Sequence, residues 1–202
     1  TMLSAESGYG DRFFYLLLDD TDIVTGRHLT KIPKAVEEVC QSLDYTPSAV
    51  MICITCVDAL LGTDMDRVCR KSSDRAGVPV VPCYMYALTR EKRLPPMASV
   101  RKSVYSLLKP RKRKSDEVNI LGYFSPLQDD CELYSLLKSA GVKTIRELSR
   151  CESFEEYEQM SQANFSLVLN AEARYAAQQM EQELNIPFIE LARVFQADKI
   201  ST

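Results

Sequence analysis

The chain has few histidines, few glycines and no long apolar run, and each shortage argues against a class of function. The sequence has a single histidine, His28. This argues against a zinc site with several histidine ligands and against a Ser-His-Asp or Cys-His nucleophile system. Seven glycines, with neither a GxGxxG nor a GxxxxGK pattern, disfavour a backbone cradle for nucleotide phosphates. No hydrophobic run approaches the roughly 18 residues that span a bilayer, and the polar start lacks the apolar core of a signal peptide. We therefore expect a cytoplasmic protein that does not cross a membrane.

The residues that are present are typical of an ordinary globular protein with a packed core. Of the 202 residues, 46% are hydrophobic and 26% are charged. A formal net charge of -3 and a pI near 5.4 give no overall attraction to nucleic acid or to anionic membranes. The seven cysteines are odd in number and lie in apolar segments, so we expect reduced thiols that mostly fill the core. Cysteine or carboxylate chemistry remains for a functional site.

Apolar runs of strand length alternate with helical periodicity along the whole chain, which is typical of parallel sheets covered by helices. The run 13–18, Phe-Phe-Tyr-Leu-Leu-Leu, predicts a buried strand that the acidic turn 19–22 closes. The spacing of Ile32, Val36 and Cys40 predicts a helix from about residue 30. Further strands are predicted at 49–54, 78–83, 118–123, 142–148, 165–169 and 186–191, with helices between them. The predicted class is α/β, with two Rossmann-like units whose parallel sheets are flanked by helices.

The segment 109–117 marks the predicted boundary between the two units, because it contains no apolar residue. It divides the chain into a first Rossmann-like domain at 1–108, a basic linker at 109–117 and a second Rossmann-like domain at 118–202. The run of basic residues has no interleaved aromatic side chain and is followed by Asp116 and Glu117. This pattern favours a solvated linker over a contact with nucleic acid.

Candidate functional residues follow from the topology alone. In open parallel sheets, ligands bind outside the carboxyl ends of the strands, where loops and helix N-termini converge. The segments that this rule selects are the turn 20–26, the stretch 55–64, Cys83 with Tyr84, and the loops 124–129, 149–152 and 170–172.

Cys53 and Cys56 have CxxC spacing, but they lie at the end of a predicted strand. Residues three apart on a strand face opposite sides of the sheet, so the two thiols do not converge while the strand continues. We therefore predict that Cys53 belongs to the core and that Cys56, at the carboxyl edge, is the better candidate for a ligand. Cys83 is a weaker candidate for a metal ligand. The triplet Gly62-Thr63-Asp64 predicts a turn into a helix capped by Asp64.

The stretch Cys53 to Met65, Cys-Ile-Thr-Cys-Val-Asp-Ala-Leu-Leu-Gly-Thr-Asp-Met, resembles a segment of nitrogenase component 1-type oxidoreductases that runs strand, cysteine, Gly-Asp-Asp and helix. Upstream, Asp-Ile-Val-Thr-Gly at 22–26 is similar to the family's Asp-Ile-Val-Phe-Gly-Gly. Downstream, the similarity extends to 119–122, 136–142 and 184–187, so the resemblance covers most of the chain.

The resemblance implies part of a three-domain architecture of Rossmann-like units, without the N-terminal part of the first domain and without the third. It implies that Cys56 is a ligand of an iron-sulfur cluster shared across a subunit interface, with Gly62 and Asp64 in the cofactor-binding segment. No Gly-Cys motif precedes the first predicted strand, so Cys56 by itself cannot hold a complete four-iron cluster. A partner subunit or residues outside this chain would have to contribute the remaining ligands.

The function implied is that of an oxidoreductase subunit that receives electrons from an ATP-driven iron protein and passes them through a cluster near Cys56 to a substrate. The implied partners are that iron protein and a homologous subunit. One alternative is a non-catalytic scaffold that carries or inserts a metal cofactor. Another is a module that binds a small molecule or metal complex between two domains without redox chemistry. Thr63 stands where the family has the second residue of Gly-Asp-Asp, which is a departure from the motif.

Overall fold

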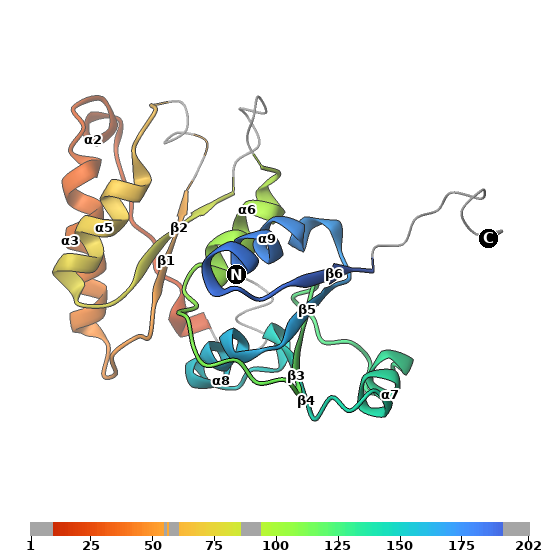
Figure 1. Cartoon of the computed structure of the whole chain (residues 1–202). Helices are drawn as coiled ribbons and strands as arrows, with labels where there is room; N and C mark the ends of the chain where they lie inside the picture. Colours follow the sequence, from red (N-terminus) through yellow and green to blue (C-terminus); the bar gives the residue numbers. More distant parts are fainter. Residues whose placement is uncertain (1–9, 55, 57–60, 86–93, 192–202) are drawn as a thin grey trace. The chain divides into compact units, whose positions relative to one another are not determined.

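The computed structural model of the chain describes residues 10–54, 56, 61–85 and 94–191. Strands alternate with helices throughout these residues, so the predicted α/β class is confirmed (Figure 1). The chain divides into two compact units, the first formed by 1–53 and 60–82 and the second by 54–59 and 83–202. The predicted division into 1–108, 109–117 and 118–202 stays a prediction.

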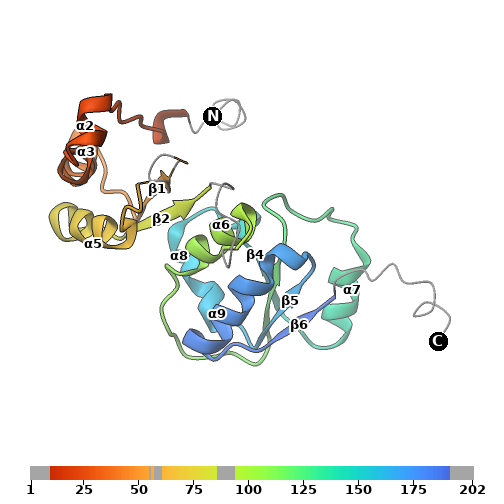
Figure 2. The same ribbon diagram turned by 90° about the horizontal axis from the view of Figure 1, so that it is seen from above.

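The first unit is built on a small sheet. Its elements are η1 (Gly10–Arg12), α2 (Asp20–Val24), α3 (His28–Ser42), β1 (Val50–Ile54), α5 (Met65–Ala76) and β2 (Val80–Tyr84). β1 and β2 form a two-stranded sheet, and α3 and α5 lie side by side against it (Figures 1 and 2). Val36, Cys69, Val78 and Val80 form the buried core between helices and sheet. The apolar face predicted for the first long helix is thus the face that packs.

The ends of these helices follow their capping residues. α5 ends at Gly77, whose backbone is left-handed with φ +71°, as the sequence predicts for a glycine that closes a helix. α2 begins with a capping box in which Asp19 accepts from the backbone of Asp22 and Asp22 accepts from the backbone of Asp19. The acidic stretch 19–22, predicted as a plain turn, is therefore the start of a short helix.

The run 13–18 does not form the buried strand that its sequence predicts. Residues 13–19 have no regular structure, and the side chains from Phe13 to Leu17 are exposed. A strand needs a neighbouring backbone to pair with, and among the described residues 13–18 joins neither of the two sheets. Apolar composition predicted burial correctly only where a partner surface exists.

The second unit contains a four-stranded parallel sheet in the order β4-β3-β5-β6. Its elements are α6 (Pro96–Tyr105), β3 (Glu117–Leu121), α7 (Glu132–Ser139), β4 (Thr144–Glu147), η2 (Leu148–Arg150), α8 (Phe154–Glu158), η3 (Gln159–Gln162), β5 (Phe165–Val168), η4 (Ala171–Ala173), α9 (Arg174–Leu184) and β6 (Phe188–Glu190). The chain passes from β3 to β4 on one side and then to β5 on the other. The carboxyl ends of β3 and β5 are therefore the point at which the strand order reverses.

Helices cover both faces of this sheet (Figures 1 and 2). On one face α6, α8 and α9 pack on Leu121 and Val168, and Met160 and Met180 fill the space between them. On the other face α7 contributes Leu137, which packs with Val118, Ile120 and Leu167. All five residues of β3 are buried, which fits the central position of this strand in the sheet.

The predicted linker is attached to the second unit rather than free in solvent. The backbone of Lys114 donates to Gln162 O at 2.8 Å, and Arg111 pairs with Glu158 at 2.6 Å. Glu117, at the end of the predicted linker, is the first residue of β3 and is buried. α6, which precedes the linker, packs on α9 of the second unit. Backbone pairing thus holds a segment that composition alone predicts to be solvated.

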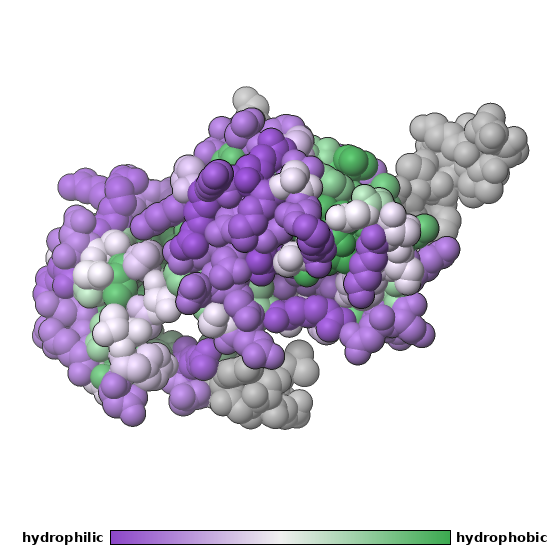
Figure 3. Space-filling view, turned by 60° about the horizontal axis from the view of Figure 1, so that its bottom comes forward, coloured by the Kyte–Doolittle hydropathy of each residue, from purple (hydrophilic) through white to green (hydrophobic). Residues whose placement is uncertain are grey.

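Hydrophilic side chains predominate on the face of the molecule that Figure 3 shows, and apolar ones form smaller patches. Within the described ranges, no helix is both long and apolar enough to cross a bilayer.

Candidate functional site

Cys56 lies two residues beyond Ile54, the last residue of β1, and its side chain is exposed. This is the carboxyl end of a strand, the position at which the topology predicts ligand binding. An exposed thiol at such an edge is accessible to a metal or to a reactive partner. The assignment of Cys56 as a cluster ligand stays a prediction.

Cys53 was predicted to belong to the core, and this prediction is wrong, because its side chain is exposed. The alternation along β1 gives the physical reason. Val50 and Ile52 pack against the core beneath α3 and α5, so Met51 and Cys53 point to the opposite face, where both are exposed. Cys83, the weaker candidate for a metal ligand, is buried in β2.

The predicted turn before α5 is present. Gly62 has φ +63°, a left-handed conformation that glycine adopts without steric cost. Asp64 is the N-cap of α5, and its carboxylate accepts from Arg67 N at 2.9 Å. The predicted helix cap at Asp64 is therefore confirmed, and this hydrogen bond is a structural role for the carboxylate.

His28 connects this turn to the corner between α2 and α3. The imidazole is 4% exposed, its Nε2 lies 3.5 Å from Thr63 Oγ1, and its Nδ1 lies 3.2 Å from Asp22 O. The only histidine in the sequence therefore connects its own corner to Thr63, which is 35 residues away in the sequence. The sequence does not predict this contact, because no local spacing relates positions 28 and 63.

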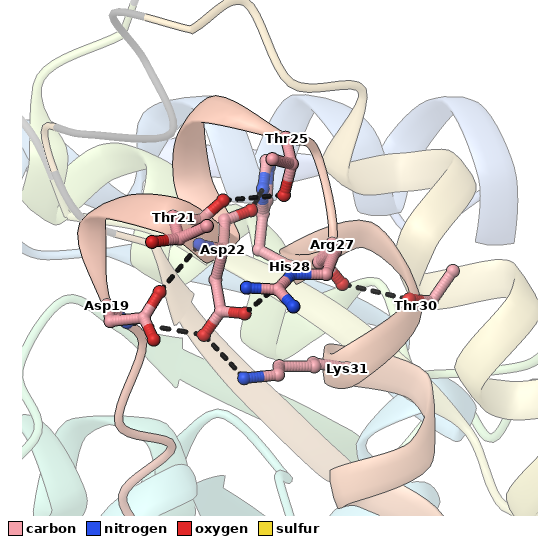
Figure 4. Close-up of polar contacts among 8 residues, drawn as sticks. All are labelled: Asp19, Thr21, Asp22, Thr25, Arg27, His28, Thr30 and Lys31. Carbon is pink, nitrogen blue, oxygen red and sulfur yellow. Dashed lines mark hydrogen bonds and ion pairs between the residues drawn. The ribbon is translucent and has the colours of Figure 1, made fainter.

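Ionic contacts around Asp22 stabilise the corner between α2 and α3 (Figure 4). Its side chain is 1% exposed, and its carboxylate pairs with Lys31 at 2.5 Å and with Arg27 at 3.3 Å. The hydrogen bond from Lys31 holds the pKa of this carboxyl below its ordinary value, against the opposing effect of burial. The aspartate spacing from 19 to 22 was the available signal, because a capping box joins residues three apart.

A groove of about 620 Å³ lies in the first unit between this corner and the turn before α5. It combines exposed apolar side chains with two cationic ones, Arg67 and Lys71. The lining residues are Ile23, Val24, Thr25, Gly26, His28, Leu29, Thr30, Leu61, Gly62, Thr63, Asp64, Arg67, Val68 and Lys71. Both predicted segments, 20–26 and the end of 55–64, thus contribute to one surface.

The described residues do not form a complete metal site. Among the residues placed by the structure, no group of three or more His, Cys, Asp or Glu side chains could hold a metal ion. A four-iron cluster takes about four cysteine ligands. The residues present therefore do not fit a whole cluster, and Cys56 offers one exposed thiol toward it.

At the carboxyl edge of the second sheet, a buried arginine that the sequence did not reveal joins two predicted loops. Arg101 of α6 donates to Gly122 O, at the end of β3, and pairs with Glu172, after β5, at 2.9 Å. The ring of Phe124 lies over the guanidinium, 4.6 Å from its carbon. Asn170 caps the turn by accepting from Glu172 N. The reversal point of this sheet is therefore filled by protein contacts.

The loop 149–152 has a similar structural role at the end of β4. Glu147 is buried and accepts from Leu127 N at 3.0 Å, from Arg150 Nε at 3.2 Å and from the hydroxyl of Tyr134. Burial, together with the hydrogen bond to Glu147, raises the pKa of Tyr134 to about 12. Arg150 also pairs with Asp129 at 2.7 Å. These contacts hold the loops after β3 and β4 together.

The chain is similar in sequence to proteins of nitrogenase and of its cofactor biosynthesis. The NifE iron-molybdenum cofactor biosynthesis protein of Nostoc sp. is 27% identical over 177 residues, which cover 86% of this chain and 36% of that protein. The nitrogenase molybdenum-iron protein alpha chain of Methanosarcina barkeri is 29% identical over 197 residues, covering 93% of this chain and 36% of that protein. The chain thus spans about a third of the length of these relatives.

A solved structure of nitrogenase Cp1 at pH 6.5 has the same fold, with a TM-score of 0.63 and 22% identity over 87% of this chain and 34% of the other. A family model described as nitrogenase component 1 type oxidoreductase matches residues 2–201. The resemblance carried by the segment from Cys53 to Met65 is therefore confirmed. Because this match extends over nearly the whole sequence, the chain belongs to the nitrogenase component 1-type oxidoreductase family.

Proposed function

We propose that this chain is part of an oxidoreductase subunit in which Cys56 supplies one thiolate to an iron-sulfur cluster that carries electrons to a substrate. The observation that carries the proposal is the exposed thiol of Cys56 just beyond the carboxyl end of β1. A ligand to a shared cluster has to be accessible from outside its own fold, and a buried cysteine is not. Family membership supports the chemistry, because thiolates hold iron in such clusters.

The other ligands come, in this proposal, from a homologous subunit or from residues outside this chain. The described residues offer no group of three metal-ligating side chains, so this part of the chain does not supply a full ligand set by itself. A cluster shared between subunits would require each subunit to present a thiol at its surface, as Cys56 does. Gly62 and Asp64 would act indirectly, by setting the turn and helix that follow Cys56 in sequence.

The proposed electron donor is an ATP-driven iron protein, and the groove of the first unit offers a surface for it. Leu29 and Leu61 expose apolar area there, and Arg67 and Lys71 add positive charge. Apolar side chains rimmed by charged ones are typical of surfaces that bind proteins. The second of the two segments that line the groove begins at Leu61, five residues beyond Cys56 in the sequence.

A second candidate function is a non-catalytic scaffold that carries or inserts a metal cofactor. It is favoured by the similarity to the NifE protein of Nostoc sp., which is named for iron-molybdenum cofactor biosynthesis. A scaffold would need the thiol of Cys56 but no substrate turnover.

The test is the iron and sulfide content and the visible spectrum of the longest natural form of the protein, purified without oxygen. Cys56→Ser is compared with Cys53→Ser, a matched control that removes another exposed thiol three residues away. We expect bound iron in the parent and the control and its loss in Cys56→Ser. Iron that is retained in Cys56→Ser, or absent from every form with the homologous subunit present, rejects the assignment.

Turnover then separates the two functions. A redox subunit reduces substrate when supplied with electrons, and Cys56→Ser abolishes both iron and turnover. A scaffold delivers its cofactor to an apo-protein without turnover of its own, and Cys56→Ser abolishes delivery. If Cys56→Ser changed neither bound iron, nor turnover, nor cofactor delivery, the result would favour a module that binds a small molecule or metal complex without redox chemistry.

A further inference from the structure

Two basic side chains of α5, Arg67 and Lys71, line the groove of the first unit without a carboxylate partner. Both are exposed, and among the described residues neither forms an ion pair. Arg75, four residues beyond Lys71 on the same helix, does pair with Glu37 of α3. The positive charge of α5 is therefore neutralised near the end of the helix but not beside the groove.

The spacing of these two cations brings them together on one face of the helix. Residues four apart on a helix have Cβ atoms about 6 Å from each other, and like charges at this spacing destabilise the helix. An anion that binds to both side chains removes this repulsion. The guanidinium of Arg67 can donate two parallel hydrogen bonds to the oxygens of a phosphate or carboxylate, and the ammonium of Lys71 adds a compact charge. The pair thus has the chemistry of an anion site.

The other polar side chains that line the groove are already engaged within the protein. The hydroxyls of Thr25 and Thr30 each donate to a backbone carbonyl of the preceding turn (Figure 4), and that of Thr63 contacts the imidazole of His28. Asp64, the one acidic side chain among the lining residues, accepts from the backbone at the start of α5. The first turn of α3 has neither an acidic residue nor a side-chain cap, so its positive end adds to the two cations.

Apolar side chains form the rest of the groove wall. Ile23, Val24, Leu29 and Val68 line it, and the exposed fractions of Val24 and Leu29 are 84% and 40%. The volume of about 620 Å³ lies within the range of roughly 300 to 1,000 Å³ that is usual for small-molecule sites. A bare inorganic ion would leave this apolar wall uncovered, so the groove fits an anion that carries an apolar body.

We propose that this groove binds a small phosphate monoester, with the phosphate between Arg67 and Lys71 and its apolar body against Leu29. A phosphate monoester carries about -1.5 to -2 charges at pH 7, which matches two cations, whereas one carboxylate would neutralise only one of them. Side chains supply the donors, so the site needs no glycine-rich backbone cradle. This ligand and a protein docked on the groove would exclude each other. The site does not involve Cys56, so it stands or falls separately from the proposed electron-transfer function.

The experiment is a calorimetric titration of the longest natural form of the protein with phenyl phosphate as the probe. We expect saturable binding at one site. Phenol, which has the ring without the charge, and inorganic phosphate, which has the charge without the ring, should each bind several-fold more weakly. Added salt should weaken the binding of phenyl phosphate, because it screens the attraction between exposed charges.

Variants of α5 locate the site. Arg67→Gln and Lys71→Met should each weaken the binding of phenyl phosphate about five-fold, because each removes one exposed charge partner. Arg70→Gln is the matched control, since Arg70 is exposed on the same helix but does not line the groove, and it should leave binding unchanged. Thermal unfolding midpoints equal to that of the parent establish that the variants are folded.

Three results overturn the proposal. The first is the absence of saturable binding by the parent. The second is phenol or inorganic phosphate binding as tightly as phenyl phosphate. The third is binding that survives both Arg67→Gln and Lys71→Met, or that Arg70→Gln weakens equally. The iron content of Cys56→Ser tests the proposed function separately, so failure of one proposal is distinguishable from failure of the other.

Discussion

Arg101 donates two hydrogen bonds to the carbonyl of Gly122, one from Nη2 at 2.8 Å and one from Nε at 3.0 Å. The guanidinium also donates to Met97 O and pairs with Glu172, so it joins α6 to the ends of β3 and β5. Arg101 is 5% exposed, which makes these contacts costly to lose. The carboxyl edge of the second sheet therefore depends on a residue of the preceding helix.

Replacing this arginine should destabilise the second unit strongly. Arg101→Gln is expected to lower the free energy of unfolding by about 3 kcal/mol, because the Gly122 carbonyl loses its donors in a buried position. Arg111→Gln, which breaks a partly exposed ion pair with Glu158, should cost less than about 1 kcal/mol. Urea unfolding of both variants measures the difference, and equal midpoints would contradict it.

Gly122 should tolerate no side chain. Its φ is +153°, and a Cβ at this position would lie 3.0 Å from Asn170 N, which is backbone and cannot move aside easily. Gly122→Ala is expected to destabilise the protein by about 2 kcal/mol more than Gly26→Ala, where φ is +72° but no atom lies within 4 Å. Thermal unfolding of the two variants tests this, and similar losses would mean that the loop after β5 shifts to make room.

Acid should weaken the corner around Asp22 in a defined direction. The hydrogen bond from Lys31 keeps the pKa of Asp22 in the folded protein below the value of about 3.9 in the unfolded chain. The resulting stabilisation is therefore fully present above pH 4 or so and is lost as the pH falls through the folded pKa.

Asp22→Asn and Lys31→Met should both flatten the dependence of the urea midpoint on pH between about 2 and 5, since each removes one partner of the same bond. Hydrogen exchange of 19–31 at pH 7 provides a control for the fold of the corner. A parental pH dependence in Lys31→Met would show that another group holds the carboxylate.

The cysteines should differ in reactivity according to their burial. Cys53 and Cys56 are exposed, whereas Cys69 is 1% exposed and burial raises its pKa to about 12. In native protein near pH 8, we expect iodoacetamide to label Cys53 and Cys56 and to spare Cys69, because the thiolate is the reacting form.

Mass spectrometry of proteolytic fragments measures the labelling at each site. In urea the unfolded chain should be labelled at Cys69 as well, which controls for intrinsic reactivity. Labelling of native Cys69 at the rate of Cys56 would contradict the packing of α5 on the sheet. Cys69→Ser is expected to cost about 1 to 3 kcal/mol, because it buries a hydroxyl among apolar side chains.

Most elements of the fold could be predicted because their signals are local. The spacing of Ile32 and Val36 predicted the face of α3 that packs, and Asp64 and Gly77 predicted where α5 begins and ends. These signals are sufficient since a helix cap or an apolar face depends on residues at most a few positions apart. The family could be recognised for a related reason, namely that its motif between Cys53 and Met65 is contiguous in sequence.

Contacts between distant segments could not be predicted in this way. Nothing local relates His28 to Thr63 or Arg101 to Gly122, and periodicity did not indicate that Cys53 is exposed. Neighbouring side chains of a strand face opposite sides of the sheet, but the sequence pattern does not indicate which of the two sides a helix covers. The candidate residue Cys56 came from sequence, whereas its exposure came from the structure.

The sequence by itself determined the α/β alternation, the helix caps and the family, because each depends on local chemistry or on a contiguous motif. Only the tertiary structure decided which of the apolar runs of strand length are buried. The run 13–18 is as apolar as β5, yet it is exposed, because burial requires a partner surface that composition does not supply.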